Sequence, residues 1–62
     1  MNYVTKLIEP DHVGEVYYSE YFNEEAVLVH TAPEFVTFKF SDGDKITITK
    51  NTFLREWEYV RG

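Results

Sequence analysis

The chain has 62 residues, no cysteine, and eleven acidic against six basic residues, which gives a formal net charge of −5 at pH 7. Its length predicts a single domain over residues 1–62 with a thin margin of stability, because so short a chain buries only about 60% of the surface that its unfolded form exposes. Disulfides are excluded, and His12 and His30 stand too far apart to suggest a metal site. The core must therefore be built from apolar side chains, which five Phe, five Tyr and one Trp supply.

The charge is divided unevenly along the chain. Residues 1–34 carry seven acidic residues and one lysine, a net charge of −6, whereas residues 35–62 carry a net charge of +1. The acidic first half would repel phosphates, so we expect no direct binding of nucleic acid. The N-terminus lacks the basic start and apolar run of a signal peptide, and no apolar stretch approaches the roughly 20 residues that span a bilayer. These features predict a cytoplasmic protein with no membrane association.

The residues before the β-hairpin described below contain one clear strand and two segments that suit a strand or a strand edge. Tyr3–Ile8 and Gly14–Tyr18 each suit a strand or a strand edge, and the Glu9-Pro10-Asp11 run ends the first of them. Ala26–His30 is nearly continuous in apolar residues, as expected for a central strand covered on both sides, and we expect Val27 and Val29 to share one face.

A β-hairpin is predicted over residues 35–50. Phe35–Phe40 alternates so that Val36, Phe38 and Phe40 face one way, and Ile46 and Ile48 of Lys45–Lys50 can match them from the partner strand. Asp42-Gly43 lies between the two strands and is a preferred pair for a tight turn in which both central residues have positive φ.

The remaining residues complete an all-β pattern. Asn51–Leu54 suits one helical turn capped by Asn51 or Thr52, and Glu56–Val60 suits a closing strand in which Trp57 or Tyr59 completes the core. The order of short strands, three-strand meander, helical turn and closing strand resembles a single five-stranded antiparallel SH3-like barrel with one short helical turn before the last strand. The segment from Phe35 to Val60 also resembles very short phage-encoded SH3-like proteins of unassigned role. Such architectural likeness implies a fold and little about function.

The sequence lacks the groupings that catalysis or cofactor binding needs. A nucleophile requires a base within hydrogen-bond reach, and the chain offers no cysteine, two isolated histidines and no glycine-rich phosphate loop. The Ser41–Asp44 run is similar to the start of a calcium loop, but the remaining ligands are missing. We therefore expect no catalytic residues, no cofactor and no bound metal.

The candidate binding segment covers residues 17–25, where aromatic and acidic residues are concentrated. Strand alternation can bury only about half of its four aromatic rings, so the others should reach solvent. Tyrosine is favoured at protein interfaces, and aromatic rings surrounded by acids suit a basic or proline-rich partner. The structural alternative is that the rings close one end of the barrel. The predicted partner-binding residues are Tyr17, Tyr18, Glu20, Tyr21, Phe22, Glu24 and Glu25.

Three functions remain open on the sequence alone. The first is a non-catalytic protein-binding module, an adaptor or inhibitor, that presents this acidic, tyrosine-rich surface to a protein with a basic surface. The second is an acidic mimic of DNA that blocks a nucleic-acid-binding host enzyme, which would need a row formed by Glu15, Glu20, Glu24, Glu25 and Glu34. The third is a structural subunit that forms homo-oligomers through its edge strands.

Overall fold

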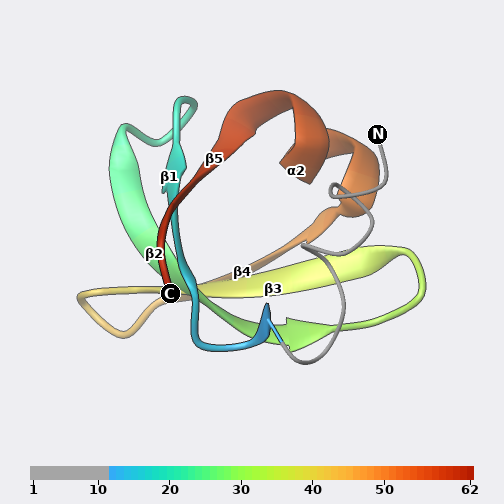
Figure 1. Ribbon diagram of the computed structural model, residues 1–62, viewed down its shortest axis with the longest axis horizontal. Helices are drawn as coiled ribbons and strands as arrows, with labels where there is room; N and C mark the ends of the chain where they lie inside the picture. Colours follow the sequence, from blue (N-terminus) through green and yellow to red (C-terminus); the bar gives the residue numbers. More distant parts are fainter. Residues whose placement is uncertain (1–11) are drawn as a thin grey trace.

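The computed structural model describes residues 12–62, which form one five-stranded antiparallel sheet and one short helix (Figure 1). The predicted strand Tyr3–Ile8 lies outside the described residues. The strands follow the sheet order β4-β3-β2-β1-β5, so the last strand pairs with the first. The elements are β1 (Val16–Ser19), β2 (Glu24–Thr31), β3 (Phe35–Phe40), β4 (Lys45–Thr49), α2 (Lys50–Glu56) and β5 (Trp57–Arg61).

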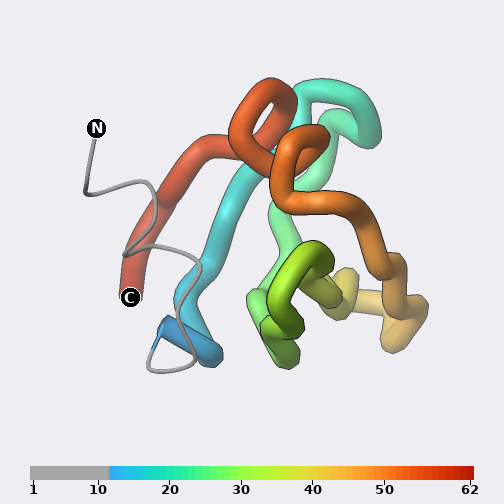
Figure 2. Tube along the Cα trace, turned by 90° about the vertical axis from the view of Figure 1, so that its right-hand side faces the viewer, coloured from blue at the N-terminus to red at the C-terminus, as the bar shows by residue number. Residues whose placement is uncertain are grey.

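The sheet is curled but open, and its two edges are β4 and β5 (Figure 2). The predicted all-β class, the antiparallel pairing and the short helix before the last strand are confirmed. Closure into a barrel is not confirmed, because β4 and β5 do not pair with each other. Helix α2 follows one edge strand and precedes the other, and it contacts both of them as well as β3. Within residues 12–62, no helix has the length and apolar character needed to cross a membrane.

The core lies on one face of the sheet, where alternate side chains of the strands meet the helix. Burying these side chains stabilises the fold by roughly 1.5–3 kcal/mol for each large aliphatic or aromatic residue. The predicted inward faces of β3 and β4 are confirmed, since Phe40, Ile46 and Ile48 lie against the core. The buried hydrophobic residues are Tyr17, Ala26, Leu28, Val36, Phe38, Phe53 and Trp57.

The predicted hairpin between β3 and β4 forms, with Ile46 opposite Phe38 and Ile48 opposite Val36, but its turn differs from the predicted one. The Gly43 N–H donates to the Phe40 carbonyl at 3.0 Å, and the Phe40 N–H donates to the Asp44 carbonyl at 2.8 Å. Gly43 has a φ of 96°, and it is the only residue of this turn with positive φ, so the expectation for Asp42 was wrong. This pattern is a three-residue loop, in which a type I turn is followed by a glycine bulge.

Two local expectations are corrected by the backbone. On β2 the side chains that enter the core are Ala26 and Leu28, while Val27 remains 37% exposed. The expectation that this strand is covered on both sides is therefore wrong at Val27, and a register shift follows between Leu28 and His30.

The helix also begins earlier than the sequence pattern predicts. Its N-cap is Thr49, which has an extended backbone and whose hydroxyl accepts the Thr52 N–H at 3.2 Å. Thr49 ends β4 and caps α2 at once, so no loop separates the two elements.

Candidate functional site

The turn between β1 and β2, here called the acidic turn (residues 20–24), is held by hydrogen bonds to the residue that precedes it. Ser19 pairs with Glu24, and the Ser19 carbonyl accepts the Asn23 N–H at 2.7 Å. The buried Ser19 hydroxyl accepts the Phe22 N–H at 3.1 Å. The backbone of the turn is therefore fixed without help from any partner.

Asn23 and Glu20 complete the framework of the acidic turn. Asn23 has a φ of 58°, a left-handed conformation that asparagine adopts more readily than most residues, and its side-chain oxygen accepts the Tyr18 hydroxyl. The Glu20 N–H donates to the Glu56 carbonyl at 2.9 Å, which ties the turn to the end of α2.

The four aromatic residues of the candidate segment divide between core and surface. Tyr17 is 1% exposed and packs edge-on against Phe38 and Phe53, so it belongs to the core and not to a partner-binding surface. Tyr18 is half-buried. Tyr21 is 74% exposed and Phe22 is 38% exposed, so these two rings provide the accessible aromatic surface. The expectation that about half of the rings reach solvent agrees with this division.

Phe22 connects that surface to the core. Its ring lies 5.4 Å from the Phe40 ring and 6.4 Å from the Trp57 ring, measured between centroids. The Tyr21 ring also contacts it, with the two centroids 4.9 Å apart and the planes nearly perpendicular. Edge-to-face contacts of this kind are favourable, so Phe22 offers an apolar surface that is packed against neighbouring rings.

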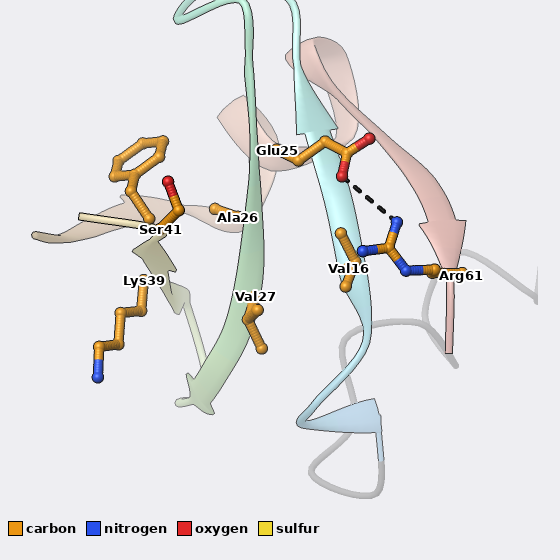
Figure 3. A pocket seen from close by; sticks show the side chains of 8 residues that line it. Val16, Glu25, Ala26, Val27, Lys39, Ser41 and Arg61 are labelled. Carbon is orange, nitrogen blue, oxygen red and sulfur yellow. Dashed lines mark hydrogen bonds and ion pairs between the residues drawn. The ribbon is translucent and has the colours of Figure 1, made fainter. Parts of the chain in front are cut away.

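The three glutamates of the candidate segment do not share one site. Glu20 and Glu24 belong to the acidic turn, and all three carboxylates are exposed. Glu25 projects from the opposite side of β2 to Ala26 and accepts a hydrogen bond from Arg61 of β5 at 3.3 Å (Figure 3). Because side chains alternate along a strand, Glu24 and Glu25 lie on opposite faces of the sheet.

A groove of ≈ 370 Å³ lies between the acidic turn and the β3–β4 turn. Its apolar surface comes from Phe22, Phe40 and Ile46, and its rim carries three carboxylates against the single ammonium of Lys45. We call it the acidic groove. Its lining residues are Phe22, Glu24, Phe40, Asp42, Asp44, Lys45 and Ile46.

Only Phe22 and Glu24 of the acidic groove were predicted from the sequence. The sequence pattern places Asp42 in a turn, and the Asp42 carboxylate does accept the Asp44 N–H at 3.0 Å. These residues become part of the groove through the pairing of β2 with β3. Ala26 lies opposite Phe40, so the β3–β4 turn lies beside the start of β2.

A second polar cluster lies near the start of β1. The Tyr17 hydroxyl donates to Glu15 at 3.0 Å, and the other oxygen of that carboxylate lies 2.9 Å from the His12 ring nitrogen Nδ1. Burial raises the pKa of the Tyr17 hydroxyl above its usual value, and the hydrogen bond to Glu15 and the negative charge nearby act in the same direction. Tyr17 therefore stays protonated in the folded protein well into the alkaline range.

No three His, Cys, Asp or Glu side chains within residues 12–62 lie close enough together to hold a metal ion. Comparisons of the chain with family models, with curated proteins and with solved structures found no match. Functional inference therefore depends on the geometry described above.

Proposed function

We propose that this chain is a small non-catalytic protein-binding module, an adaptor or inhibitor, that binds a basic segment of another protein in the acidic groove. The observation that carries the proposal is the position of Phe22. Its ring is partly exposed and is held against Phe40, beneath a rim of carboxylates from two different turns. An apolar surface beside unpaired acids is suited to an arginine or lysine with an apolar neighbour.

Charge supports the same partner chemistry. Glu24, Asp42 and Asp44 outnumber Lys45 at the groove, and Glu20 is exposed on the adjoining turn. None of these acids has an ion pair within residues 12–62, where the pairs join Arg61 to Glu25 and His12 to Glu15. A basic partner would relieve their mutual repulsion and would be attracted before contact, most strongly at low salt.

We further propose that the fold is an SH3-like barrel. The order of elements supports this assignment, since a meander of β2, β3 and β4 is followed by a short helix and by a strand that returns to pair with β1. The contacts of α2 with both edge strands also support the assignment, because in such a barrel the helix lies between the last two strands.

The DNA-mimic alternative requires one row of acids, and the described residues do not favour it. Glu24 begins β2, whereas Glu34 lies in the loop after the end of the same strand. Glu15 is engaged by Tyr17 and His12. The acids are thus distributed over both ends of the molecule rather than along one line.

The test uses nuclear magnetic resonance of labelled protein with a short probe peptide, in which two arginines flank a leucine. The backbone amides of Phe22, Glu24 and Asp44 are expected to shift, because these residues line the groove. The double variant Tyr21→Ala with Glu24→Lys changes two exposed side chains and should weaken binding at least about tenfold, or roughly 1.4 kcal/mol, while the circular dichroism spectrum is preserved.

Two controls make the result specific. A peptide with glutamates in place of the arginines should produce no shifts, and Glu34→Lys, the same charge change on a different exposed acid, should leave binding within about twofold. Shifts spread evenly over the protein, or full affinity in the double variant, would show that the acidic groove is not the binding site.

A further inference from the structure

A row of basic and apolar residues crosses the whole sheet on the face opposite the core. The register aligns Arg61 with Val16, Val16 with Val27, Val27 with Lys39, and Lys39 with Lys45, so that each of the five strands contributes one residue. Side chains alternate along each strand, and Tyr17, Ala26 and Phe38 next to these positions are buried. We call Arg61, Val16, Val27, Lys39 and Lys45 the basic row.

A groove of ≈ 310 Å³ lies along four residues of the basic row, Arg61, Val16, Val27 and Lys39. Figure 3 shows Val16 and Val27 in its middle, with Lys39 on one side and the Glu25–Arg61 pair on the other. Val27 is 37% exposed although it sits at the centre of the sheet. The surface therefore has the order cation, two valines, cation.

Two of the three charges of the basic row, those of Lys39 and Lys45, have no ion pair within the described part of the chain. Lys39 and Lys45 lie directly opposite each other on neighbouring strands, an arrangement of like charges that destabilises a sheet. Neither ammonium has an ion pair within residues 12–62, and Arg61 has only its exposed pair with Glu25. A carboxylate bound beside Lys39 would relieve this repulsion.

The acidic turn of a second copy has the complementary order. Tyr21 is 74% exposed at its tip, with Glu20 before it and Glu24 after it. Lys39 and Arg61 are three strand spacings apart, a span of about 14 Å at the usual strand separation. A tyrosine ring fits between them, and the long lysine and arginine side chains can reach carboxylates on either side of that ring. Nucleic acid fits less well, because the net charge of −5 and the acidic groove would repel its phosphates.

We propose that the acidic turn of one copy docks on the basic row of another, with Tyr21 against Val16 and Val27 and its flanking glutamates near Lys39 and Arg61. The contact joins two different surfaces, so copies associate head to tail, into chains or a closed ring. The inference shares the acidic turn with the proposed function and adds the basic row, of which only Lys45 also lines the acidic groove. A basic partner in the acidic groove would compete with the second copy for Glu24.

The test is sedimentation velocity of the purified protein from about 20 μM to 1 mM, at low and at physiological salt. The sedimentation coefficient should rise with concentration and fall with salt. Lys39→Glu should weaken association at least about tenfold, as should Glu24→Lys. The control Lys50→Glu makes the same charge change as the first variant, on α2 outside the row, and should associate like the unmodified protein.

A mixing experiment identifies the head-to-tail contact. Lys39→Glu protein keeps its acidic turn and Glu24→Lys protein keeps its basic row, so an equimolar mixture should associate much more strongly than either variant alone. A monomeric unmodified protein at about 1 mM would overturn the proposal, as would association that both variants retain or a mixture that stays monomeric.

Further outcomes separate this inference from the proposed function. If the unmodified protein is monomeric but a glutamate-rich peptide or a DNA duplex shifts the amides of Val27 and Lys39, the row binds a different acidic partner and self-association is wrong. If association holds while the arginine probe peptide fails to bind, the proposed function is wrong and the head-to-tail contact stands.

Discussion

Phe38 and Trp57 stack face to face, with ring centroids 4.0 Å apart and planes inclined by 7°. Phe38 belongs to β3 and Trp57 begins β5, and these two strands are not neighbours in the sheet. The stack therefore joins residues across the core that hydrogen bonding within the sheet does not connect. Trp57 also contacts Phe22, so the same ring supports the aromatic surface of the acidic groove.

Replacing Trp57 with alanine should destabilise the protein by about 3–5 kcal/mol, because a buried ring and its stacking partner are lost together. For a domain of this size that is a large share of the total stability. Urea unfolding followed by circular dichroism gives the free energy. Leu54→Ala is the matched control, since Leu54 lies on α2 with 46% of its surface exposed, and its cost should stay below about 1 kcal/mol. Equal effects of the two changes would contradict the assigned role of Trp57.

Replacing Gly43 with valine should cost more than about 1 kcal/mol, because a β-branched residue is strained at the φ of 96° that the turn requires. No atom lies within 4 Å of an added Cβ, so the penalty arises from the backbone and not from a clash. Gly43→Asn should therefore cost clearly less than Gly43→Val. The thermal midpoints of the two variants provide the comparison, and identical midpoints would exclude backbone strain as the cause.

Asn23 should tolerate glycine better than valine for a related reason. Glycine keeps the left-handed conformation at a φ of 58° and loses only the contact with Tyr18, at a cost of about 0.5–1 kcal/mol. Valine loses that contact and adds strain, so its total cost should reach about 2 kcal/mol. Chemical denaturation measures both, and a valine variant as stable as the glycine variant would show that the turn relaxes to another conformation.

Stability should decline above about pH 10, where the hydroxyl of Tyr17 ionises in the unfolded chain but not in the folded one. Its pKa is raised in the folded state, chiefly by burial, so the stabilisation is complete below the unfolded pKa and is lost as the pH rises beyond it. One such group contributes a slope of at most about 1.4 kcal/mol per pH unit.

Tyr17→Phe should remove this contribution to the alkaline slope while keeping the ring contacts with Phe38 and Phe53. Urea midpoints at a series of pH values from about 8 to 11.5 measure the slope. Tyr21→Phe is the control, because Tyr21 is 74% exposed, and it should leave the slope of the unmodified protein in place. A Tyr17→Phe protein with an unchanged slope would contradict the role assigned to burial.

The elements from residue 35 onward could be predicted from the alternation of apolar and polar residues and from the turn residues. Both patterns are visible within a few residues of sequence. Val36, Phe38 and Ile46 alternate over a long enough run to fix the inner face, and Gly43 marks the turn. The pattern of β2 was ambiguous, since Ala26 to Val29 are all apolar and either alternate set could enter the core. The structure selects the set with Leu28, whose side chain meets Phe38 of the neighbouring strand in register.

The acidic groove could be predicted only in part, because its residues come from two turns that are distant in sequence, the acidic turn and the β3–β4 turn. Local composition identified Tyr21, Phe22 and Glu24, and the exposure of all three agrees with a surface role. Composition cannot tell that Asp44 lies beside Phe22, which depends on how β2 and β3 align. The basic row was not predictable for the same reason, since Lys39 and Arg61 come into one row only through the order and register of the strands.

The hydrogen bond from Glu20 to Glu56 has a kinetic consequence. It belongs to the region where β1 meets β5, whose pairing joins Val16 to Arg61 across 45 positions of sequence, whereas β2, β3 and β4 pair with their neighbours in the chain. Contacts between distant segments carry the larger loop-closure cost, so this ladder should form late in folding and open first in the native state. Each opening releases the acidic turn from α2, whereas the hydrogen bonds to Ser19 that hold the turn itself do not involve β5.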